Sequence, residues 1–304
     1  MTRAEGPWAH THKSVLPATP GRVFAALTTA RELRRWFAED VEISAQNGGM
    51  VRFWGRHVYG APPPGADQRI TRFEPGRAFA FQWPFEGLAT EVVVTLEPGD
   101  AGEDGSPRTQ LVLQHRFPAA LAVDHPGELV DDLWRLTIGN LDAYLRGGEG
   151  IVLPDYSDPA PEIRASIVID APRARVFQAL LDPAALNQWV AIAAVVEPRV
   201  GGRYTYGWDY QQDGKDVVGG PTRILELVEN EWLVTDWPDW RGDPTKRPTR
   251  VMWQLESLSD EKTRVTVIHG TFPRVVDFGD YPFGWRSFLE QLKTLLEQDL
   301  FKKA

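Results

Sequence analysis

Residues 174–189 read ARVFQALLDPAALNQW, and residues 21–36, which lie 153 positions earlier, read GRVFAALTTARELRRW. Both stretches carry a Val-Phe pair, an Ala-Leu pair, a leucine and a closing tryptophan at identical spacing. Self-similarity at a fixed shift is the sequence signature of a repeated structural unit. A chain of 304 residues is also long for one hydrophobic core and comfortable for two. The sequence therefore predicts a tandem duplication.

Further landmarks follow in the same order in both halves, with small changes of spacing such as loop insertions cause. The aligned pairs are Gly48-Gly49 with Gly201-Gly202, Arg69-Ile70 with Arg223-Ile224, Trp83 with Trp237, His115 with His269, and Trp134-Arg135 with Trp285-Arg286. The stretch between the halves is rich in glycine, proline and aspartate and lacks periodicity, which is typical of a linker. We predict a first domain over residues 1–148, a linker over 149–161 and a second domain over 162–304.

Caps and periodicities predict the same elements in each half: a strand, two short helices, a run of strands and a long helix. Asp182-Pro183 offers an N-cap followed by a proline, and Thr29 with Glu32 fits a capping box at the equivalent place. Period-two alternation predicts antiparallel strands over 90–97, 110–115, 166–170, 203–208, 249–256 and 264–269. One apolar stripe along residues 131–146, and another along 283–301, predicts a long helix that covers each sheet.

These residues resemble the START-like helix-grip domains of the family related to the activator of Hsp90 ATPase. The resemblance is carried by Ala171-Pro172, by Val176 to Leu180, by Asp182-Pro183 through Trp189, by Gly201-Gly202-Arg203-Tyr204 and by residues 284–293. It covers nearly all of the second half, whereas the first half lacks the Asp-Pro pair and the glycine before Trp134. It implies an α+β fold of two tandem helix-grip domains, each a curved antiparallel sheet wrapped around its long C-terminal helix. It also implies a cavity between sheet and helix, which the superfamily uses for hydrophobic ligands.

Charge and cysteine content argue against several classes of protein. The net charge is −9 and neither half is basic, which disfavours binding to nucleic acid or to an anionic membrane surface. The chain has no cysteine, so disulfides, thiolate nucleophiles and thiolate metal sites are excluded. No apolar run has the length of a signal peptide or of a membrane span, about 18 residues. We expect a cytoplasmic protein without membrane insertion.

Motifs for common cofactors are missing from the sequence. It has no phosphate loop, no dinucleotide-binding glycine pattern, no His-Glu-x-x-His and no Gly-x-Ser-x-Gly, so no cofactor is predicted. His10 and His12 alternate across one residue and could place two imidazoles on one side of an extended segment. The sequence alone offers no plausible third ligand beside them, so no metal site is predicted.

His115 and His269 each end a predicted strand on the side of its apolar residues. Each should therefore point toward the cavity. One interpretation is a polar handle for a ligand or a general base, and the other is a structural histidine bonded at the strand end.

Aromatic residues mark candidate cavity walls in both halves. Alternation places Tyr204, Tyr206 and Trp208 on one face, where the first half has Val51, Phe53 and Gly55. The predicted ligand-binding residues are Trp36, Phe53 and His115 in the first domain and Trp189, Tyr204, Tyr206, Trp208, Trp253 and His269 in the second. This set favours the second domain as the more selective site. In the alternative, its rings fill a tighter core and the first domain is the open one.

Three functions remain for such a chain, because one fold hosts many activities. The first is binding of a hydrophobic or aromatic small molecule, with no dedicated set of catalytic residues, which favours a binding protein over an enzyme and leaves the enzyme alternative open. The second is an aromatase, cyclase or dehydratase acting on a polyketide-like substrate, which needs acid and base groups in a dry pocket. The third is regulation of an Hsp90-type chaperone. We favour the first.

Overall fold

A computed structural model describes residues 6–60, 68–212 and 214–301 of the chain. Contacts divide the chain into two compact units. The first comprises Met1–Pro159 and Arg274–Asp280, and the second comprises Ala160–Pro273 and Tyr281–Ala304. The segment 274–280 therefore groups with the first unit although it follows most of the second in sequence.

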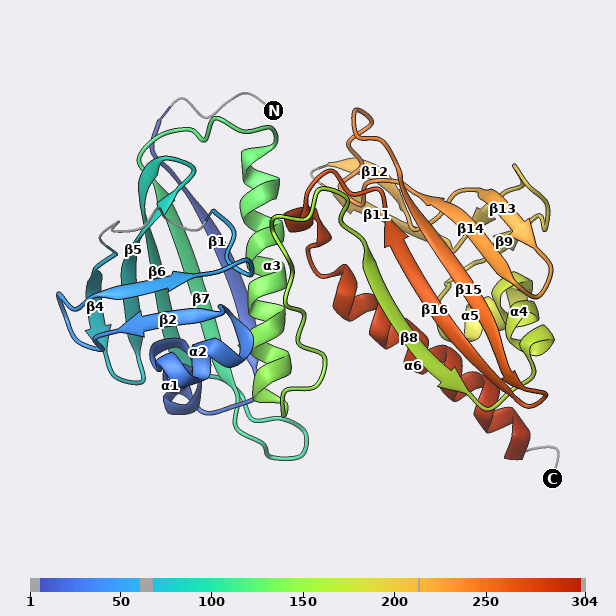
Figure 1. Cartoon of the computed structure of the whole chain (residues 1–304), viewed down its shortest axis with the longest axis horizontal. Helices are drawn as coiled ribbons and strands as arrows, with labels where there is room; N and C mark the ends of the chain where they lie inside the picture. The colour runs from blue at the N-terminus through green and yellow to red at the C-terminus, as the bar shows by residue number, and fades with distance from the viewer. Residues whose placement is uncertain (1–5, 61–67, 213, 302–304) are drawn as a thin grey trace. The chain divides into compact units, whose positions relative to one another are not determined.

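The first unit has a strand, two short helices, a run of strands and a long helix, drawn from blue to green in Figure 1. Its elements are β1 (Trp8–Leu16), α1 (Pro20–Thr28), α2 (Ala30–Trp36), β2 (Asp40–Ile43), β3 (Val51–Trp54), β4 (Ile70–Glu74), β5 (Ala78–Phe85), β6 (Leu88–Pro98), β7 (Thr109–Phe117) and α3 (Pro126–Leu145). One antiparallel sheet has the strand order β1-β7-β6-β5-β4, and β2 pairs with β3 separately.

The second unit repeats this order with more short strands. Its elements are β8 (Ile163–Ile169), α4 (Arg173–Leu181), α5 (Pro183–Trp189), β9 (Val195–Val196), β10 (Tyr204–Thr205), β11 (Trp208–Gln212), β12 (Lys215–Gly219), β13 (Ile224–Val228), β14 (Trp232–Trp237), β15 (Thr249–Ser259), β16 (Lys262–Gly270) and α6 (Tyr281–Phe301). Between β16 and α6, the short helix η1 (Val275–Phe278) belongs to the first unit.

Both five-stranded sheets have the same topology. The second has the order β8-β16-β15-β14-β13, which matches β1-β7-β6-β5-β4 strand for strand. Each of these sheets takes all its strands from one half of the chain. The predicted fold class, two tandem α+β units with a long C-terminal helix over an antiparallel sheet, is confirmed.

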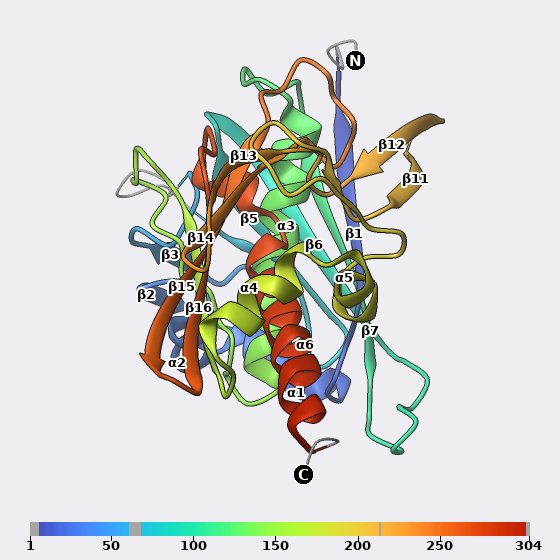
Figure 2. The same ribbon diagram turned by 90° about the vertical axis from the view of Figure 1, so that its right-hand side faces the viewer.

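The long helices cover their sheets with the predicted apolar stripes. In α6 the buried residues include Trp285, Leu289, Leu292 and Leu296, and Figure 2 shows this helix lying along its own sheet. Full burial of each such side chain stabilises the fold by roughly 1.5–3 kcal/mol. The helix α3 begins at Pro126, earlier than predicted, because a proline is well tolerated at the first helical position. No helix among the described residues is long and apolar enough to cross a bilayer.

The two predicted caps differ in outcome. The Asp182 carboxylate accepts a hydrogen bond from the Ala184 N–H at 3.0 Å, so it caps α5 as predicted. Thr29 is the N-cap of α2, but its side chain makes no capping hydrogen bond. The Glu32 carboxylate instead accepts hydrogen bonds from Arg22 at 2.6 Å and from the hydroxyl of Tyr144 at 2.8 Å. The capping-box prediction was therefore wrong for Glu32, because α1 and α3 supply stronger partners.

The strand predicted over 203–208 is interrupted. Gly207 has a φ of +70°, a backbone conformation that glycine adopts without steric cost, and it separates β10 from β11. The two strands pair with different partners, β9 and β12. Alternation over six residues therefore overestimated the length of this strand.

The predicted linker, residues 149–161, contains no helix or strand, and its residues up to Pro159 belong to the first unit. The Val152 N–H donates to the side-chain oxygen of Asn140 at 2.7 Å. The imidazole of His57 donates from Nδ1 to the Pro154 carbonyl at 2.6 Å. These contacts place the linker beside α3, where it forms part of a cavity wall.

Candidate functional site

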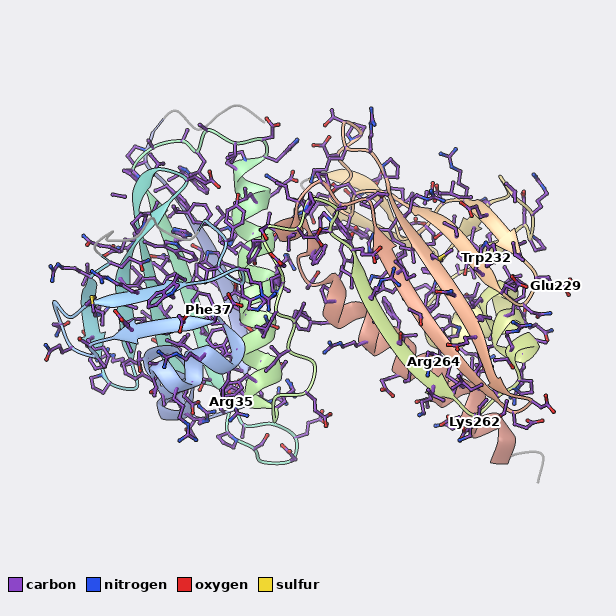
Figure 3. The ribbon with its side chains drawn as sticks, in the orientation of Figure 1. Arg35, Phe37, Glu229, Trp232, Lys262 and Arg264 are labelled. Atoms are coloured by element: carbon purple, nitrogen blue, oxygen red, sulfur yellow. The ribbon has the colours of Figure 1, made fainter. Side chains whose placement is uncertain are left out.

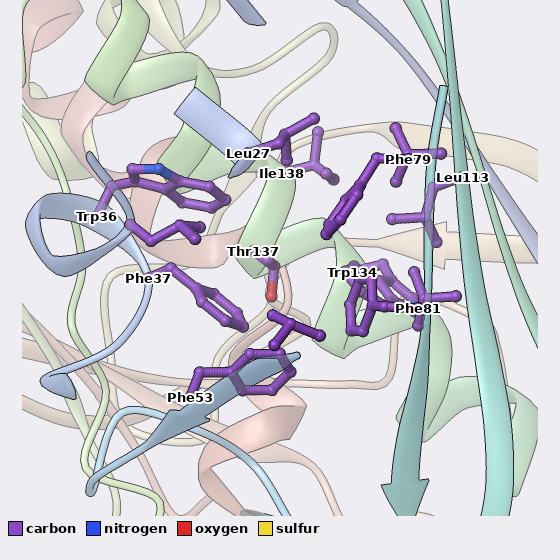
Figure 4. Close-up of a pocket in the computed structure, with 14 residues that line it drawn as sticks. Leu27, Trp36, Phe37, Phe53, Phe79, Phe81, Leu113, Trp134, Thr137 and Ile138 are labelled. Atoms are coloured by element: carbon purple, nitrogen blue, oxygen red, sulfur yellow. The ribbon is translucent and has the colours of Figure 1, made fainter. Parts of the chain in front are cut away.

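The first unit has a cavity of about 40 Å³ between its sheet and α3. On the same measure one buried water needs roughly 10–15 Å³, so the space exceeds that of a single water. The lining residues are Leu27, Leu33, Trp36, Phe37, Val51, Phe53, Phe79, Phe81, Val92, Val94, Leu113, Trp134, Thr137 and Ile138. Figure 4 shows Trp36, Phe37 and Phe53 on one side, with Phe79, Phe81 and Leu113 across the space from them.

The polar atoms of the lining side chains are already engaged in hydrogen bonds. The Thr137 hydroxyl donates to the Leu133 carbonyl at 2.7 Å, and the Trp36 indole N–H donates to the Ala26 carbonyl at 3.2 Å. The indole N–H of Trp134 is bound by His115. The cavity therefore presents an apolar surface without free donors. Such a surface favours contact with a hydrocarbon or aromatic ligand over contact with water.

A second, smaller cavity of about 10 Å³, roughly the size of one water, shares part of this wall. Its lining residues are Trp36, Phe37, His57, Tyr59, Trp83, Leu133, Leu136, Thr137, Asn140, Pro154 and Tyr156. Trp36, Phe37 and Thr137 line both cavities. Phe37, labelled in Figure 3, is only half-buried and directly follows the last residue of α2. These shared side chains separate an apolar space from a polar one.

Trp83 gives the smaller cavity a hydrogen-bond donor. Its ring is buried, and its indole N–H has no acceptor among the described residues. The aligned Trp237 of the second unit donates its N–H to the hydroxyl of Tyr281 at 3.1 Å. When Trp134 is aligned with Trp285, Val130 takes the place of Tyr281, so the first unit lacks that acceptor.

His115 belongs to a closed hydrogen-bond network. Its Nδ1 accepts from the Trp134 indole N–H at 3.3 Å, and its Nε2 donates to the Thr90 hydroxyl at 2.8 Å. The Thr90 hydroxyl in turn donates to the Trp83 carbonyl. Burial, with a smaller contribution from His10, lowers the pKa of His115 to about 3. The ring is therefore neutral, and both of its nitrogens are occupied.

The second unit repeats this network. The indole N–H of Trp285 donates to Nδ1 of His269 at 3.1 Å, and Nε2 of His269 donates to Thr249 at 2.7 Å. The Thr249 hydroxyl donates to the Trp237 carbonyl at 3.0 Å. Burial lowers the pKa of His269 to about 3. A neutral imidazole with both nitrogens bound is not a free base, and this arrangement matches the structural interpretation of the two histidines.

The structure brings most of the predicted second-unit residues together in one aromatic cluster. The hydroxyl of Tyr204 donates to the Leu180 carbonyl at 2.7 Å, and the ring centroids of Tyr204 and Tyr206 are 5.6 Å apart. The indole N–H of Trp208 donates to the Val190 carbonyl at 2.9 Å. Burial raises the pKa of both tyrosines. Each of these rings packs against protein.

Trp253 occupies space in the second unit that the first unit leaves open. Its ring is buried and lies edge-on to Trp189 and Trp285, at centroid distances of 5.7 and 5.8 Å. Trp253 pairs across the strands with Val267, and Val94 pairs with Leu113. Val267 and Leu113 each lie two residues before the aligned histidines, so Val94 is the counterpart of Trp253 in the first unit. Val94 lines the larger cavity. The exchange of tryptophan for valine at this position is the sequence signal that distinguishes the two cores.

Of the predicted first-unit residues, Trp36 and Phe53 line the larger cavity, and His115 does not. Sequence reasoning missed Phe37, Val94 and Thr137. Thr137 lies one helical turn after Trp134 on α3, a spacing that places both on one face of the helix.

Comparison with known proteins gives the following matches. The family model described as "Activator of Hsp90 ATPase homolog 1-like protein" matches residues 17–146 and 170–297. Protein MLL2253 from Mesorhizobium loti is 22% identical, with a TM-score of 0.36, over 45% of this chain and 98% of its own. The di-domain ARO/CYC BexL from the BE-7585A biosynthetic pathway is 13% identical, with a TM-score of 0.35, over 95% of this chain and 99% of its own.

DynU16, described as a putative protein in the dynemicin biosynthetic locus, is 20% identical, with a TM-score of 0.37, over 94% of this chain and 97% of its own. No curated protein matches the chain significantly. The family model covers both repeats and most of the chain. The chain therefore belongs to the family of activator of Hsp90 ATPase homolog 1-like proteins, and it carries the family's domain twice.

Proposed function

We propose that the first unit binds a hydrophobic, aromatic small molecule in the cavity between its sheet and α3. The observation that carries this proposal is the lining, which is apolar apart from Thr137 and has its polar side-chain atoms engaged. Protein interiors are close-packed and hold few voids larger than a water molecule. An apolar void is costly to the fold, and an apolar ligand would recover the lost contacts.

The cavity must enlarge to take a ring system, and Phe37 is the side chain best placed to move. It is half-buried, it lies just beyond the end of α2, and it contacts both cavities. A ligand that displaces the Phe37 ring would extend from the apolar space toward Trp83. Its aromatic body would then contact Phe53 and Phe81, and an acceptor group would lie near the indole N–H.

The second unit would contribute stability rather than the principal site. Trp253 fills the position of Val94, and Tyr204 and Trp208 use their polar atoms on backbone carbonyls. The ligand-binding role predicted for these second-unit residues stays a prediction. A cyclase-type reaction needs a free acid or base, and the lining of the larger cavity supplies neither.

The experiment is titration of the full chain with naphthalene, followed by tryptophan fluorescence and calorimetry, beside native mass spectrometry of gently purified protein. Val94→Trp introduces the second unit's residue into the wall and should weaken binding at least tenfold. Val93→Leu is the matched control, since strand alternation places Val93 on the opposite face of the sheet and it does not line the cavity. No saturable binding, or equal binding by a folded Val94→Trp variant, would refute the proposal.

A further inference from the structure

The edge strand β1 presents two histidines to α3. It is the first strand in the order β1-β7-β6-β5-β4, and it packs against α3. Its alternate residues, including His10 and His12, are half-buried, whereas their neighbours in sequence are exposed. His10 is also the direct cross-strand partner of the buried His115, so both lie on the face that α3 covers.

The helix supplies a carboxylate at the same place. Asp131 lies in the second turn of α3, and the ligand atoms of His10, His12 and Asp131 are all within 4.8 Å of one another. Nε2 of His10 lies 3.7 Å from Oδ1 of Asp131, and these side chains are only 14% and 24% exposed. Tetrahedral Zn²⁺, with bonds of roughly 2.0–2.2 Å, separates its ligand atoms by about 3.4 Å. The spacing between His10 and Asp131 is therefore within a few tenths of an ångström of the zinc geometry, and the His12 nitrogen lies within 4.8 Å of both ligand atoms.

The surrounding charges orient the carboxylate. Nε of Arg135 lies 2.8 Å from Oδ2 of Asp131, which holds that oxygen on the side away from the His10 contact. The same guanidinium pairs with Asp280 at 3.3 Å, so its charge is balanced within the first unit. Carboxylates that bind metals are commonly held by such second partners. With both imidazoles neutral, Asp131, Asp280 and Arg135 together leave one net negative charge to receive a cation.

We propose that His10, His12 and Asp131 bind one Zn²⁺ ion, with water in the fourth position. Two imidazole nitrogens favour a first-row transition metal over Mg²⁺ or Ca²⁺, which prefer oxygen ligands. Bound there, the ion joins the edge strand of the sheet to the helix that covers it. It would therefore stabilise the first unit and fix the side of α3 next to β1.

The test uses the full chain without a histidine tag, stripped of metal, and titrated with Zn²⁺ against a chromophoric chelator. We expect one equivalent to bind with a dissociation constant at or below about 10 µM and to raise the thermal midpoint. Co²⁺ at the same site should give the intense visible absorption of a tetrahedral complex. His12→Gln should weaken Zn²⁺ binding at least tenfold and abolish that absorption. His12 is half-buried on an edge strand, so its replacement should leave the fold intact. The melting curve of the metal-free His12→Gln variant checks this.

The matched control is His125→Asn, which removes a histidine distant in sequence from β1 and keeps a residue type that tolerates the positive φ of 49° at this position. This variant should bind Zn²⁺ as the unaltered chain does. Asp131→Asn should also weaken binding, since a neutral amide is a poorer ligand. The proposal is overturned if the unaltered chain shows no saturable Zn²⁺ binding below about 100 µM. It is also overturned if a folded His12→Gln variant binds as tightly as the unaltered chain.

Discussion

The indole N–H of Trp285 donates a hydrogen bond to Nδ1 of His269 at 3.1 Å, and Trp134 and His115 repeat the contact at 3.3 Å. In both units this bond connects the long helix to the second strand of the sheet. It fixes the imidazole tautomer, because Nδ1 must be the unprotonated nitrogen that accepts. The repeat therefore conserves a polar connection between helix and sheet inside an otherwise apolar core.

Trp285→Ala should destabilise the second unit by about 3–5 kcal/mol, the range for removing a large buried aromatic ring. Trp285→Phe keeps most of the ring and leaves only Nδ1 of His269 without its donor. It should cost about 1–3 kcal/mol, the penalty of one unsatisfied buried acceptor. Denaturant melts of the full chain measure both values. A loss below about 1 kcal/mol for the alanine variant would contradict the assigned packing.

Stability should fall as the pH drops below about 6.5, because His115 and His269 stay neutral in the folded state with a pKa of about 3. In the unfolded chain each histidine takes up a proton near pH 6.5, so the unfolded state binds more protons between the two pKa values. The contribution of each neutral histidine to the free energy of unfolding is fully present above about pH 6.5. It falls by up to about 1.4 kcal/mol for each pH unit below that value.

His269→Gln tests this dependence, because glutamine can accept from Trp285 and donate to Thr249 without titrating. Between pH 6.5 and 5, the unaltered second unit should lose about 1.6 kcal/mol more than the variant does. Most carboxylates remain ionised in this interval, so they contribute little to the difference. Parallel pH profiles for both proteins would disprove the assignment of His269 as a buried neutral group.

The order of elements, the repeat and the long helices were predictable because they depend on local periodicity and caps, as at Asp182 and Trp285. The cavity was harder to predict. Its existence depends on which rings fill a shared volume, and single-strand alternation does not show that Trp253 occupies the space that Val94 leaves open. The third candidate metal ligand, Asp131, is distant in sequence from His10 and meets it only through the packing of α3 on β1.

The two caps should differ in strength. Asp182→Ala removes a side-chain hydrogen bond to the first turn of α5 and should cost about 0.5–2 kcal/mol. Thr29→Ala at the equivalent position of the first unit removes no such bond, so its cost should stay below about 0.5 kcal/mol. Denaturant midpoints of the two variants provide the comparison. Equal losses would mean that the Thr29 hydroxyl caps α2 in solution.

The free donor on Trp83 predicts which ligands the first unit prefers. The aligned Trp237 donates its N–H to Tyr281, whereas the N–H of Trp83 has no acceptor among the described residues. The ring of Trp83 lines the smaller cavity.

A naphthalene that carries a carbonyl, such as 1-naphthaldehyde, should bind about 2- to 12-fold more tightly than naphthalene, the factor that one net hydrogen bond of about 0.5–1.5 kcal/mol provides. Trp83→Phe removes the donor and part of the ring, so it should abolish this preference, while the affinity for naphthalene should change little because Trp83 does not line the larger cavity. Tyr281→Phe in the second unit is the matched control and should leave both affinities as they are. Calorimetric titration of the three proteins with both compounds decides the matter. A carbonyl preference that persists in Trp83→Phe would show that another donor binds the ligand.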